Sequence, residues 1–156
     1  MKFALFTALV ASASAFPSFS MLHAHSQLEA VIEGDCNTVF SKIHDTVSGF
    51  QAKNNEPAGG LYAVKVSTPT TIEVTRTTPV KHYVDDIQFL NTNQATNGGC
   101  RIVGKSQSQS LSYLDFGTNY CNMYNVIRET FGVKFGDVTV SNCKFPASDL
   151  ATCDTY

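Results

Sequence analysis

The sequence has little charge, and it lacks the signatures of several common protein classes. Only 15% of its 156 residues are charged, and the formal net charge is −2. No segment is strongly basic, so we expect no nucleic-acid partner. The chain has neither a Cys-x-x-Cys pair, which would supply close zinc ligands, nor a Gly-x-Ser-x-Gly elbow, which would present a nucleophilic serine. We therefore expect no metal site and no cofactor.

Long apolar runs are also missing. The apolar run at residues 3–11 is too short to cross a bilayer, which needs about 20 residues, and no later segment approaches that length. We therefore expect no transmembrane segment in the mature protein. Hydrophobic residues nevertheless make up 43% of the chain, which is enough for the packed core of one domain.

The amino terminus has the pattern of a signal peptide. Lys2 supplies a positive start, residues 3–11 form the apolar region, and Ala13-Ser14-Ala15 supplies the small residues of a cleavage site. We predict that residues 1–15 direct the chain into the secretory route, which permits disulfides.

A second targeting signal follows the predicted cleavage site. Residues 12–17, Ser-Ala-Ser-Ala-Phe-Pro, are similar to the Ala-Ser-Ala-Phe-Ala-Pro motif of bipartite plastid presequences in algae with secondary red plastids, such as diatoms. The resemblance implies that residues 16–26 are a transit peptide and that the protein reaches the plastid. These residues contain serines and no acidic residue, but they also lack arginine. Secretion is the alternative, although no Asn-x-Ser/Thr sequon supports it.

Two helices are predicted from apolar residues at helical spacing. The first covers residues 37–51, and Asp35 or Asn37 can cap its start. The second follows a turn at residues 115–117, with Thr118 or Asn119 as its cap. Its apolar stripe consists of Tyr120, Met123, Tyr124, Ile127 and Phe131.

Strands are predicted between these helices from β-branched, alternating segments. They cover residues 61–67, 71–77, 80–90 and 100–113, with a loop at residues 91–99. Residues 27–34 fit either a helical turn or a strand, and residues 138–140 fit a short strand. We expect one α+β domain over residues 27–156, with an antiparallel sheet of about four to five strands, two packed helices and a coil tail.

Five cysteines are candidates for disulfides: Cys36, Cys100, Cys121, Cys143 and Cys153. Because five is odd, at least one thiol lies outside any disulfide within the chain. Spacing does not fix the connectivity. We expect Cys143 and Cys153 to staple the C-terminal tail.

Three motifs in the middle of the chain resemble those of one known family. They are Tyr83-Val84-Asp85-Asp86-Ile87-Gln88-Phe89, Lys105-Ser106-Gln107-Ser108 and Asp115-Phe116-Gly117-Thr118-Asn119. In this order they resemble the signatures of the domain of unknown function 1499 family, over residues 37–128. Lys105 stands where that family usually has an arginine, and Tyr120 replaces an expected basic residue. The resemblance implies a ligand that is less charged than an arginine-rich site would bind, or no ligand, and it brings no agreed activity.

The same motifs supply the candidate ligand-binding residues: Asp86, Lys105, Ser106, Ser108, Asp115 and Asn119. Ser106 and Ser108 alternate with Ser110 and Ser112, so all four are expected on one face of a strand. That face either lines a cleft or is the solvent side of the sheet.

The acidic residues also have two interpretations. Asp85 and Asp86 point to opposite faces, so at most one faces a cleft. The alternative is that one is solvated while the other pairs with Lys105 or a backbone N–H. Asp115 and Asn119 either build the turn and cap the helix or form an anion site at the helix N-terminus.

Two classes of function remain open. The first is a non-enzymatic module that binds a small amphipathic ligand, in a cleft lined by Tyr62, Tyr83 and Tyr113, or a protein partner. The second is a hydrolase-like enzyme that uses Asp85 or Asp86 with Asp115 and Ser106. An assembly factor is a third option. No sequence feature requires catalysis, so we rank the binding module first.

Overall fold

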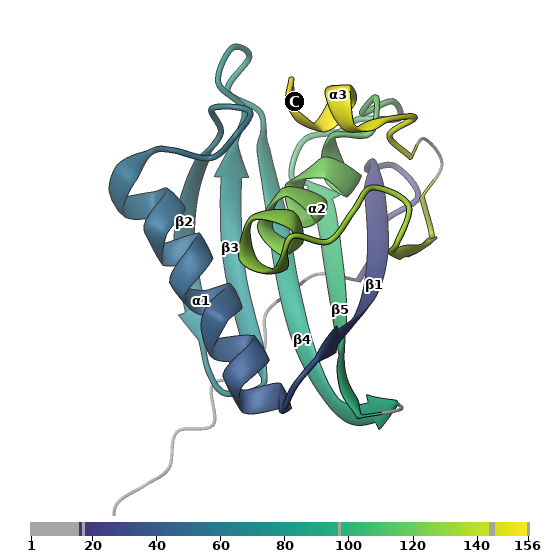
Figure 1. Cartoon of the computed structure of the whole chain (residues 1–156). Helices are drawn as coiled ribbons and strands as arrows, with labels where there is room; N and C mark the ends of the chain where they lie inside the picture. Colours follow the sequence, from purple (N-terminus) through teal and green to yellow (C-terminus); the bar gives the residue numbers. More distant parts are fainter. Residues whose placement is uncertain (1–15, 17, 97, 144–145, 156) are drawn as a thin grey trace, which may run out of the picture.

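The computed structural model describes residue 16 and residues 18–96, 98–143 and 146–155. The predicted signal peptide, residues 1–15, lies outside the described residues. The described chain has the predicted α+β architecture, in which two substantial helices pack on one face of an antiparallel sheet (Figure 1). In chain order the elements are β1 (His25–Glu33), α1 (Cys36–Lys53), β2 (Leu61–Ser67), β3 (Thr71–Thr77), β4 (Val84–Thr96), β5 (Gly99–Ser108), α2 (Thr118–Phe131), β6 (Thr139–Ser141) and α3 (Leu150–Cys153).

The sheet has six strands in the order β2-β3-β4-β5-β1-β6, one more than the largest number expected. β2 to β5 form the predicted meander. β1 pairs antiparallel with β5 on one side and with β6 on the other. The predicted strands at residues 61–67 and 71–77 have the bounds of β2 and β3. We call the helix-covered face the inner face and the opposite one the outer face.

β1 resolves the ambiguous segment at residues 27–34 as a strand. Leu28, Ala30 and Ile32 are buried on the inner face and alternate with more exposed residues. β1 begins at His25, which is two residues before the predicted start of the domain. The residues before it also contact the sheet: the Ser20 backbone N–H donates to Gln107 Oε1 at 2.9 Å.

The predicted bounds of β4 and β5 need correction. β4 begins at Val84 rather than at residue 80, and it continues through most of the expected loop to Thr96, with a shift in register between Asn91 and Ala95. β5 ends at Ser108 rather than Tyr113. Ser110 and Ser112 therefore lie outside the strand and do not extend the alternating serine face.

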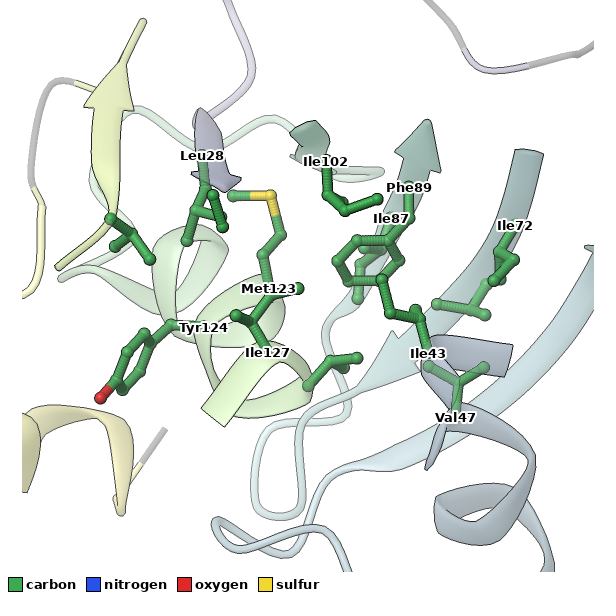
Figure 2. Packing of buried hydrophobic residues seen from close by; sticks show 14 of the residues in the cluster. Leu28, Ile43, Val47, Ile72, Ile87, Phe89, Ile102, Met123, Tyr124 and Ile127 are labelled. Carbon is green, nitrogen blue, oxygen red and sulfur yellow. The ribbon is translucent and has the colours of Figure 1, made fainter. Parts of the chain in front are cut away.

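α1 is the predicted first helix, slightly lengthened. Its cap is Asp35, whose Oδ1 accepts the backbone N–H groups of Asn37 and Thr38 at 2.9 and 3.2 Å. The buried residues of the helix are the predicted stripe: Val39, Phe40, Ile43, Val47 and Phe50. They pack on the sheet beside Ile72 and Phe89, as Figure 2 shows in part.

α2 carries the second predicted stripe, but it is buried on nearly every side. Met123 and Ile127 belong to the core shown in Figure 2. Tyr120 and Tyr124 stack on each other and meet the edge of Phe135, which follows the helix. Only Phe131 of the stripe is partly exposed. None of the helices among the described residues is long and apolar enough to cross a membrane.

Two disulfides hold the domain together, and their pairing differs from the expectation. Cys36 at the start of α1 pairs with Cys100 in β5, and Cys121 in α2 pairs with Cys153 in α3. The C-terminal tail is therefore stapled to α2 rather than within itself, and Cys143 lies outside both disulfides. The tail is not a plain coil, because it contains β6 and α3.

Candidate functional site

A row of polar side chains crosses the inner face of the sheet near one end. Its members are register partners on four neighbouring strands: Tyr62 on β2, Arg76 on β3, Asp85 on β4 and Ser108 on β5. All four are buried. A buried polar group without a hydrogen-bond partner costs about 1–3 kcal/mol, so the covering elements must supply partners for this row.

Three asparagines on α2 supply many of these partners. Asn119, Asn122 and Asn125 recur every three residues and are fully buried. Asparagine is a poor residue for a helix interior, so tertiary contacts explain their presence. We call the whole set the polar network; it consists of Glu56, Tyr62, Arg76, Asp85, Ser106, Ser108, Asp115, Asn119, Asn122 and Asn125.

Asn119 ties α2 to β5. Its Oδ1 accepts a hydrogen bond from Ser106 Oγ at 2.7 Å, and its Nδ2 donates to Ser108 Oγ at 3.2 Å. Asp115 Oδ2 accepts from the Asn119 side chain at 2.9 Å and from its backbone N–H at 3.0 Å. The N-cap position is Gly117, which makes no side-chain bond. The predicted cap at Thr118 or Asn119 is therefore wrong, and the Asp115 carboxylate orders the first turn instead.

Asn122 reaches the middle of the row. Its Nδ2 donates to Asp85 Oδ2 at 2.9 Å and to Ser106 Oγ at 3.2 Å. Its backbone carbonyl accepts from the Tyr62 hydroxyl at 2.7 Å. One helix residue therefore links β2, β4 and β5.

A buried ion pair occupies the β2–β3 side of the network. Arg76 Nη2 lies 3.0 Å from Glu56 Oε2, and neither side chain has any exposed surface. Glu56 also accepts from the Gly60 backbone N–H and, at 2.8 Å, from Asn125 Nδ2. A Cβ at Gly60 would lie 2.2 Å from Arg76 Nε. Glycine at this position therefore lets the loop backbone close over the guanidinium.

Not every donor and acceptor in the network is used. Arg76 Nε and Nη1, Asn122 Oδ1 and Asn125 Oδ1 make no hydrogen bond to any other described residue. The Glu56 charge is the only ion-pair partner that the described residues provide for Arg76. Removal of either residue would therefore leave the other charge buried without a counter-ion.

Burial raises the pKa of the Asp85 carboxyl. Hydrogen bonds from Asn122 and Ser108 and the charge of Arg76 oppose this shift, whereas the Asp115 charge adds to it. Because desolvation is the largest cause, the protonated form is favoured in the folded chain relative to the unfolded chain.

Asp85→Asn is therefore expected to change how stability depends on pH. Because the pKa of Asp85 is higher in the folded chain than in the unfolded chain, protonation of this carboxyl stabilises the fold. The stabilisation is complete below the ordinary pKa of 3.8, and it is lost as the pH rises through the pKa of the folded chain. The free energy of unfolding of the wild type, relative to Asp85→Asn, should fall with rising pH, by at most about 1.4 kcal/mol for each pH unit. Urea denaturation from about pH 4 to about pH 8 measures this difference.

Asp86→Asn is the matched control, because Asp86 is only half-buried and lies on the outer face. It should not reproduce this fall. A wild-type stability that instead rises with pH relative to Asp85→Asn would mean that Arg76 and the hydrogen bonds outweigh burial.

The structure brings four of the six candidate residues together. Ser106, Ser108, Asp115 and Asn119 belong to the polar network. Asp86 and Lys105 lie on the outer face, and Asp86 Oδ1 accepts from Gln109 Nε2 at 2.9 Å. Asp85 and Asp86 do point to opposite faces, as expected. The solvent interpretation of the serine face is wrong, because α2 covers Ser106 and Ser108.

The sequence did contain signals for some of the residues that were missed. Ile87 and Phe89 share a strand face with Asp85, which indicates an inward carboxylate. The polar residues at every third position of an otherwise apolar helix indicate partners for Asn122 and Asn125. Glu56 lies in a loop, and no local pattern pairs it with Arg76.

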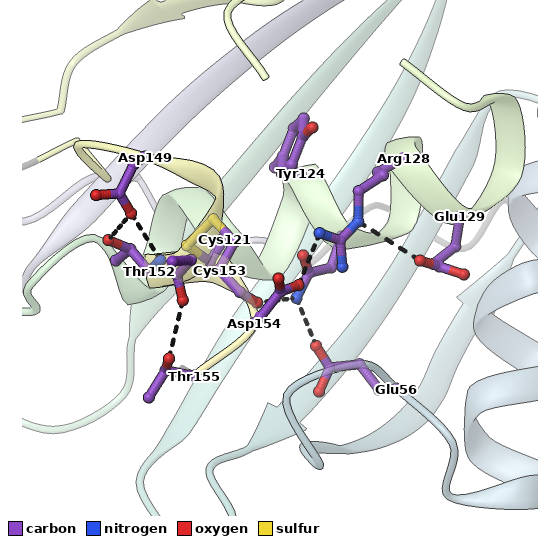
Figure 3. A network of polar contacts seen from close by, with 12 residues as sticks. Glu56, Cys121, Tyr124, Arg128, Glu129, Asp149, Thr152, Cys153, Asp154 and Thr155 are labelled. Atoms are coloured by element: carbon purple, nitrogen blue, oxygen red, sulfur yellow. Dashed lines mark hydrogen bonds and ion pairs between the residues drawn. A yellow bond between two sulfur atoms is a disulfide. The ribbon is translucent and has the colours of Figure 1, made fainter. Parts of the chain in front are cut away.

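The C-terminal tail covers the Glu56 side of the network (Figure 3). Asn125 Nδ2 donates to the Cys153 carbonyl at 2.8 Å, next to the Cys121–Cys153 disulfide. Arg128 Nη1 pairs with Asp154 Oδ1 at 2.8 Å. Asp149 caps α3 through the Thr152 backbone N–H at 2.9 Å. These contacts cover the Glu56 side of the network, whereas Asp115 is only half-buried.

A different kind of surface lies at the same end of the sheet. β3 and β5 end there, β1, β2 and β4 begin there, and α3 lies beside them (Figure 1). We call it the loop end. Its exposed apolar side chains are Met21, Leu22, Leu61, Val80, Tyr83, Leu111, Tyr113, Leu114, Phe116 and Leu150. Of the eleven large apolar side chains exposed among the described residues, only Val31 lies elsewhere.

The segments of the loop end are joined to one another. The Ser112 backbone N–H donates to the Leu22 carbonyl at 3.3 Å, and the Gln109 N–H donates to the Val84 carbonyl at 2.9 Å. A Cβ at Gly117 would lie 2.9 Å from the Ala147 backbone, so the tail packs directly on this loop. The segments that carry these apolar side chains are therefore held together by backbone contacts.

Phe116 is held in a strained conformation at this surface. Its φ is +51°, in the left-handed region, and its side chain is 66% exposed. A non-glycine residue there costs about 1–2 kcal/mol. The Asp115 carboxylate fixes the conformation by accepting the backbone N–H groups of Gly117 and Asn119. A residue with a strained backbone therefore presents its aromatic ring to solvent.

A groove of about 480 Å³ lies at the opposite end of the sheet. Its walls come from the first half of α1, including Phe40 and His44, and from the β2–β3 turn at residues 67–69. None of the candidate residues lines it.

Comparison with known proteins adds no relationship: the chain matches no protein-family model, and no curated protein is significantly similar to it.

Proposed function

We propose that this protein is a non-enzymatic binding module that engages its partner through the loop end. The observation that carries this proposal is the concentration of exposed apolar side chains at that end, together with the strained outward Phe116. Exposed apolar side chains that gather at one end of a domain are typical of an interaction surface. The polar network is then the scaffold that fixes the loops.

Burial distinguishes this proposal from the hydrolase alternative. Asp85, Ser106 and Asp115 do share one network, and a raised carboxyl pKa beside serines is a feature of some active sites. A hydrolase must nevertheless bring its serine to a substrate, and Ser106 has no exposed surface. If these residues only stabilise the fold, the same contacts are explained, and α2 does not have to move away from Ser106.

The proposed contact differs in place from the cleft expected for a small ligand. Tyr83 and Tyr113 are exposed at the loop end, but Tyr62 is buried with its hydroxyl on Asn122. The partner is therefore proposed to meet the loops at this end of the sheet rather than a cleft that includes Tyr62. We retain the plastid as the proposed location, with secretion as the alternative; two disulfides are compatible with either route. Membership of the domain of unknown function 1499 family is also retained as a proposal.

Site-specific photocrosslinking tests the proposed surface. p-Benzoylphenylalanine replaces Phe116 in one variant and Val31 in a control, since both side chains are exposed but lie at different ends of the domain. After irradiation in the cells that make the protein, adducts to lipid or protein are expected from position 116 and not from position 31. Equal labelling from both positions, or none from either, would contradict the proposal.

A further inference from the structure

We propose that the loop end inserts its apolar tips into the interfacial region of a lipid bilayer. This inference rests on the proposed function and names the partner of that same surface. The tips come from three connected segments: Met21 and Leu22 before β1, Val80 and Tyr83 in the β3–β4 loop, and the loop after β5 with Leu111 and Phe116.

The distribution of the exposed apolar side chains over several loops favours a soft, extended partner. The apolar side chains project from separate loop tips, and the most exposed of them are Met21, Val80 and Leu111, at 86, 82 and 77%. Projecting tips can each enter a deformable layer of headgroups and acyl chains, whereas a small ligand needs a concave site that encloses it.

The composition of the tips also fits a bilayer interface. Tyr83 and Tyr113 combine an apolar ring with a hydroxyl group, as do the aromatic residues that collect at headgroup level in membrane proteins. Lys81 Nζ lies 6.0 Å from the centroid of the Tyr83 ring, so a cation accompanies the apolar tip of this loop. A lysine in that position can keep its charge among the headgroups while its carbon chain is buried.

The carboxylates near the loop end are engaged within the protein. Asp86 accepts from Gln109, Asp115 accepts backbone N–H groups of its own turn, and Asp154 pairs with Arg128. Asp149 caps α3. Each of these acidic groups therefore has a partner within the protein while the apolar tips point outward, although Asp149 and Asp154 stay exposed to solvent.

Rigid presentation reduces the entropy cost of insertion. The Asp115 carboxylate accepts the backbone N–H groups of Gly117 and Asn119, which follow Phe116, and the tail packs on Gly117. Thr78 makes hydrogen bonds across the β3–β4 loop to the Tyr83 backbone. The tips are therefore already placed before they meet the bilayer.

The absence of tryptophan from the chain allows a direct test. Leu111→Trp provides a single fluorophore at the loop end, Tyr83→Trp a second one on another loop, and Val31→Trp a control on the far half of β1. With phosphatidylcholine vesicles that carry brominated acyl chains, we expect a blue shift and quenching for Leu111→Trp and Tyr83→Trp. Val31→Trp should show neither.

Phe116→Asn tests the contribution of one tip. Asparagine tolerates a positive φ, so the unfolding midpoint should be unchanged or higher. Partitioning onto the same vesicles, measured by co-sedimentation of the full chain, should fall about tenfold, because an aromatic ring no longer enters the apolar layer. Val31→Thr is the matched control and should partition like the wild type.

The outcomes separate this inference from the proposed function. No quenching at either loop-end tryptophan, combined with protein adducts from position 116 in the crosslinking experiment, overturns the bilayer as partner and leaves the binding surface in place. Adducts between two copies of the chain would make the partner a second copy. The absence of both quenching and crosslinking overturns both proposals.

Discussion

Arg76→Met is expected to lower the free energy of unfolding by about 3–5 kcal/mol, because it leaves the Glu56 carboxylate buried without its cation. Methionine retains much of the apolar volume, so the effect reports the lost charge more than a cavity. The Gly60 N–H and Asn125 Nδ2 would still donate to Glu56, but neither carries a charge. Urea denaturation of the oxidised protein at 25 °C measures the loss.

Two further variants make this prediction specific. Adding Glu56→Gln to Arg76→Met removes both charges and should recover part of the loss. Arg101→Met breaks the ion pair between Arg101 and Glu29, whose side chains are 36% and 25% exposed respectively. This substitution should lower the free energy of unfolding by no more than about 1 kcal/mol. Equal losses for Arg76→Met and Arg101→Met would show that the buried pair has no special role.

Removal of the Cys36–Cys100 disulfide by alanine at both positions is expected to cost about 4 kcal/mol. The bond closes a loop with a sequence separation of 64 and joins the start of α1 to β5. Its loss mainly increases the conformational entropy of the unfolded chain. The Cys121–Cys153 bond has half that separation, 32, so its loss should cost only about 0.6 kcal/mol less.

Cys143→Ser is the control for both disulfide variants. Cys143 lies outside the two disulfides and is half-buried, so its replacement should change the free energy of unfolding by no more than about 0.5 kcal/mol. Free energies from urea denaturation without reductant test the series. A disulfide variant that is as stable as Cys143→Ser would contradict the assigned pairing.

The fold was predicted best where one strand or helix face is apolar and the other is polar. α1 followed from the stripe that includes Val39, Ile43 and Val47, because all three are buried against the sheet. β1 was ambiguous because the small residue Ala30 points inward while Val31 points to solvent. The pairing of β1 with β5 joins distant parts of the chain, and no local pattern specifies it.

The candidate site was predicted only in part, and for a physical reason. The alternation of Ser106 and Ser108 was correct, but their environment depends on which helix covers them. Asparagine side chains on α2 make that face part of a buried network. In sequence, a strand face that is buried in this way is as polar as a solvent-exposed one, so the two cannot be distinguished. The Arg76–Glu56 pair depends on the closure of a loop over the sheet, and loop geometry is not encoded by periodicity.

These contacts assign different roles to neighbouring parts of the domain. The polar network fixes α2 and the tail on the sheet, and Asp115 belongs both to that network and to the turn that presents Phe116. Stability variants in the network and surface variants in the loops should therefore have separable effects, except at Asp115, where both meet.

Native-state hydrogen exchange of the α2 backbone tests most directly whether the polar network is a closed scaffold. The amides of residues 121–127 lie in the buried part of the helix that covers the network. We predict that they exchange only through global unfolding, with a free energy equal to that from urea denaturation and with the same dependence on urea. Exchange through a local opening at a free energy several kcal/mol lower would contradict this account, because it would give solvent and substrates a route to Asp85 and Ser106.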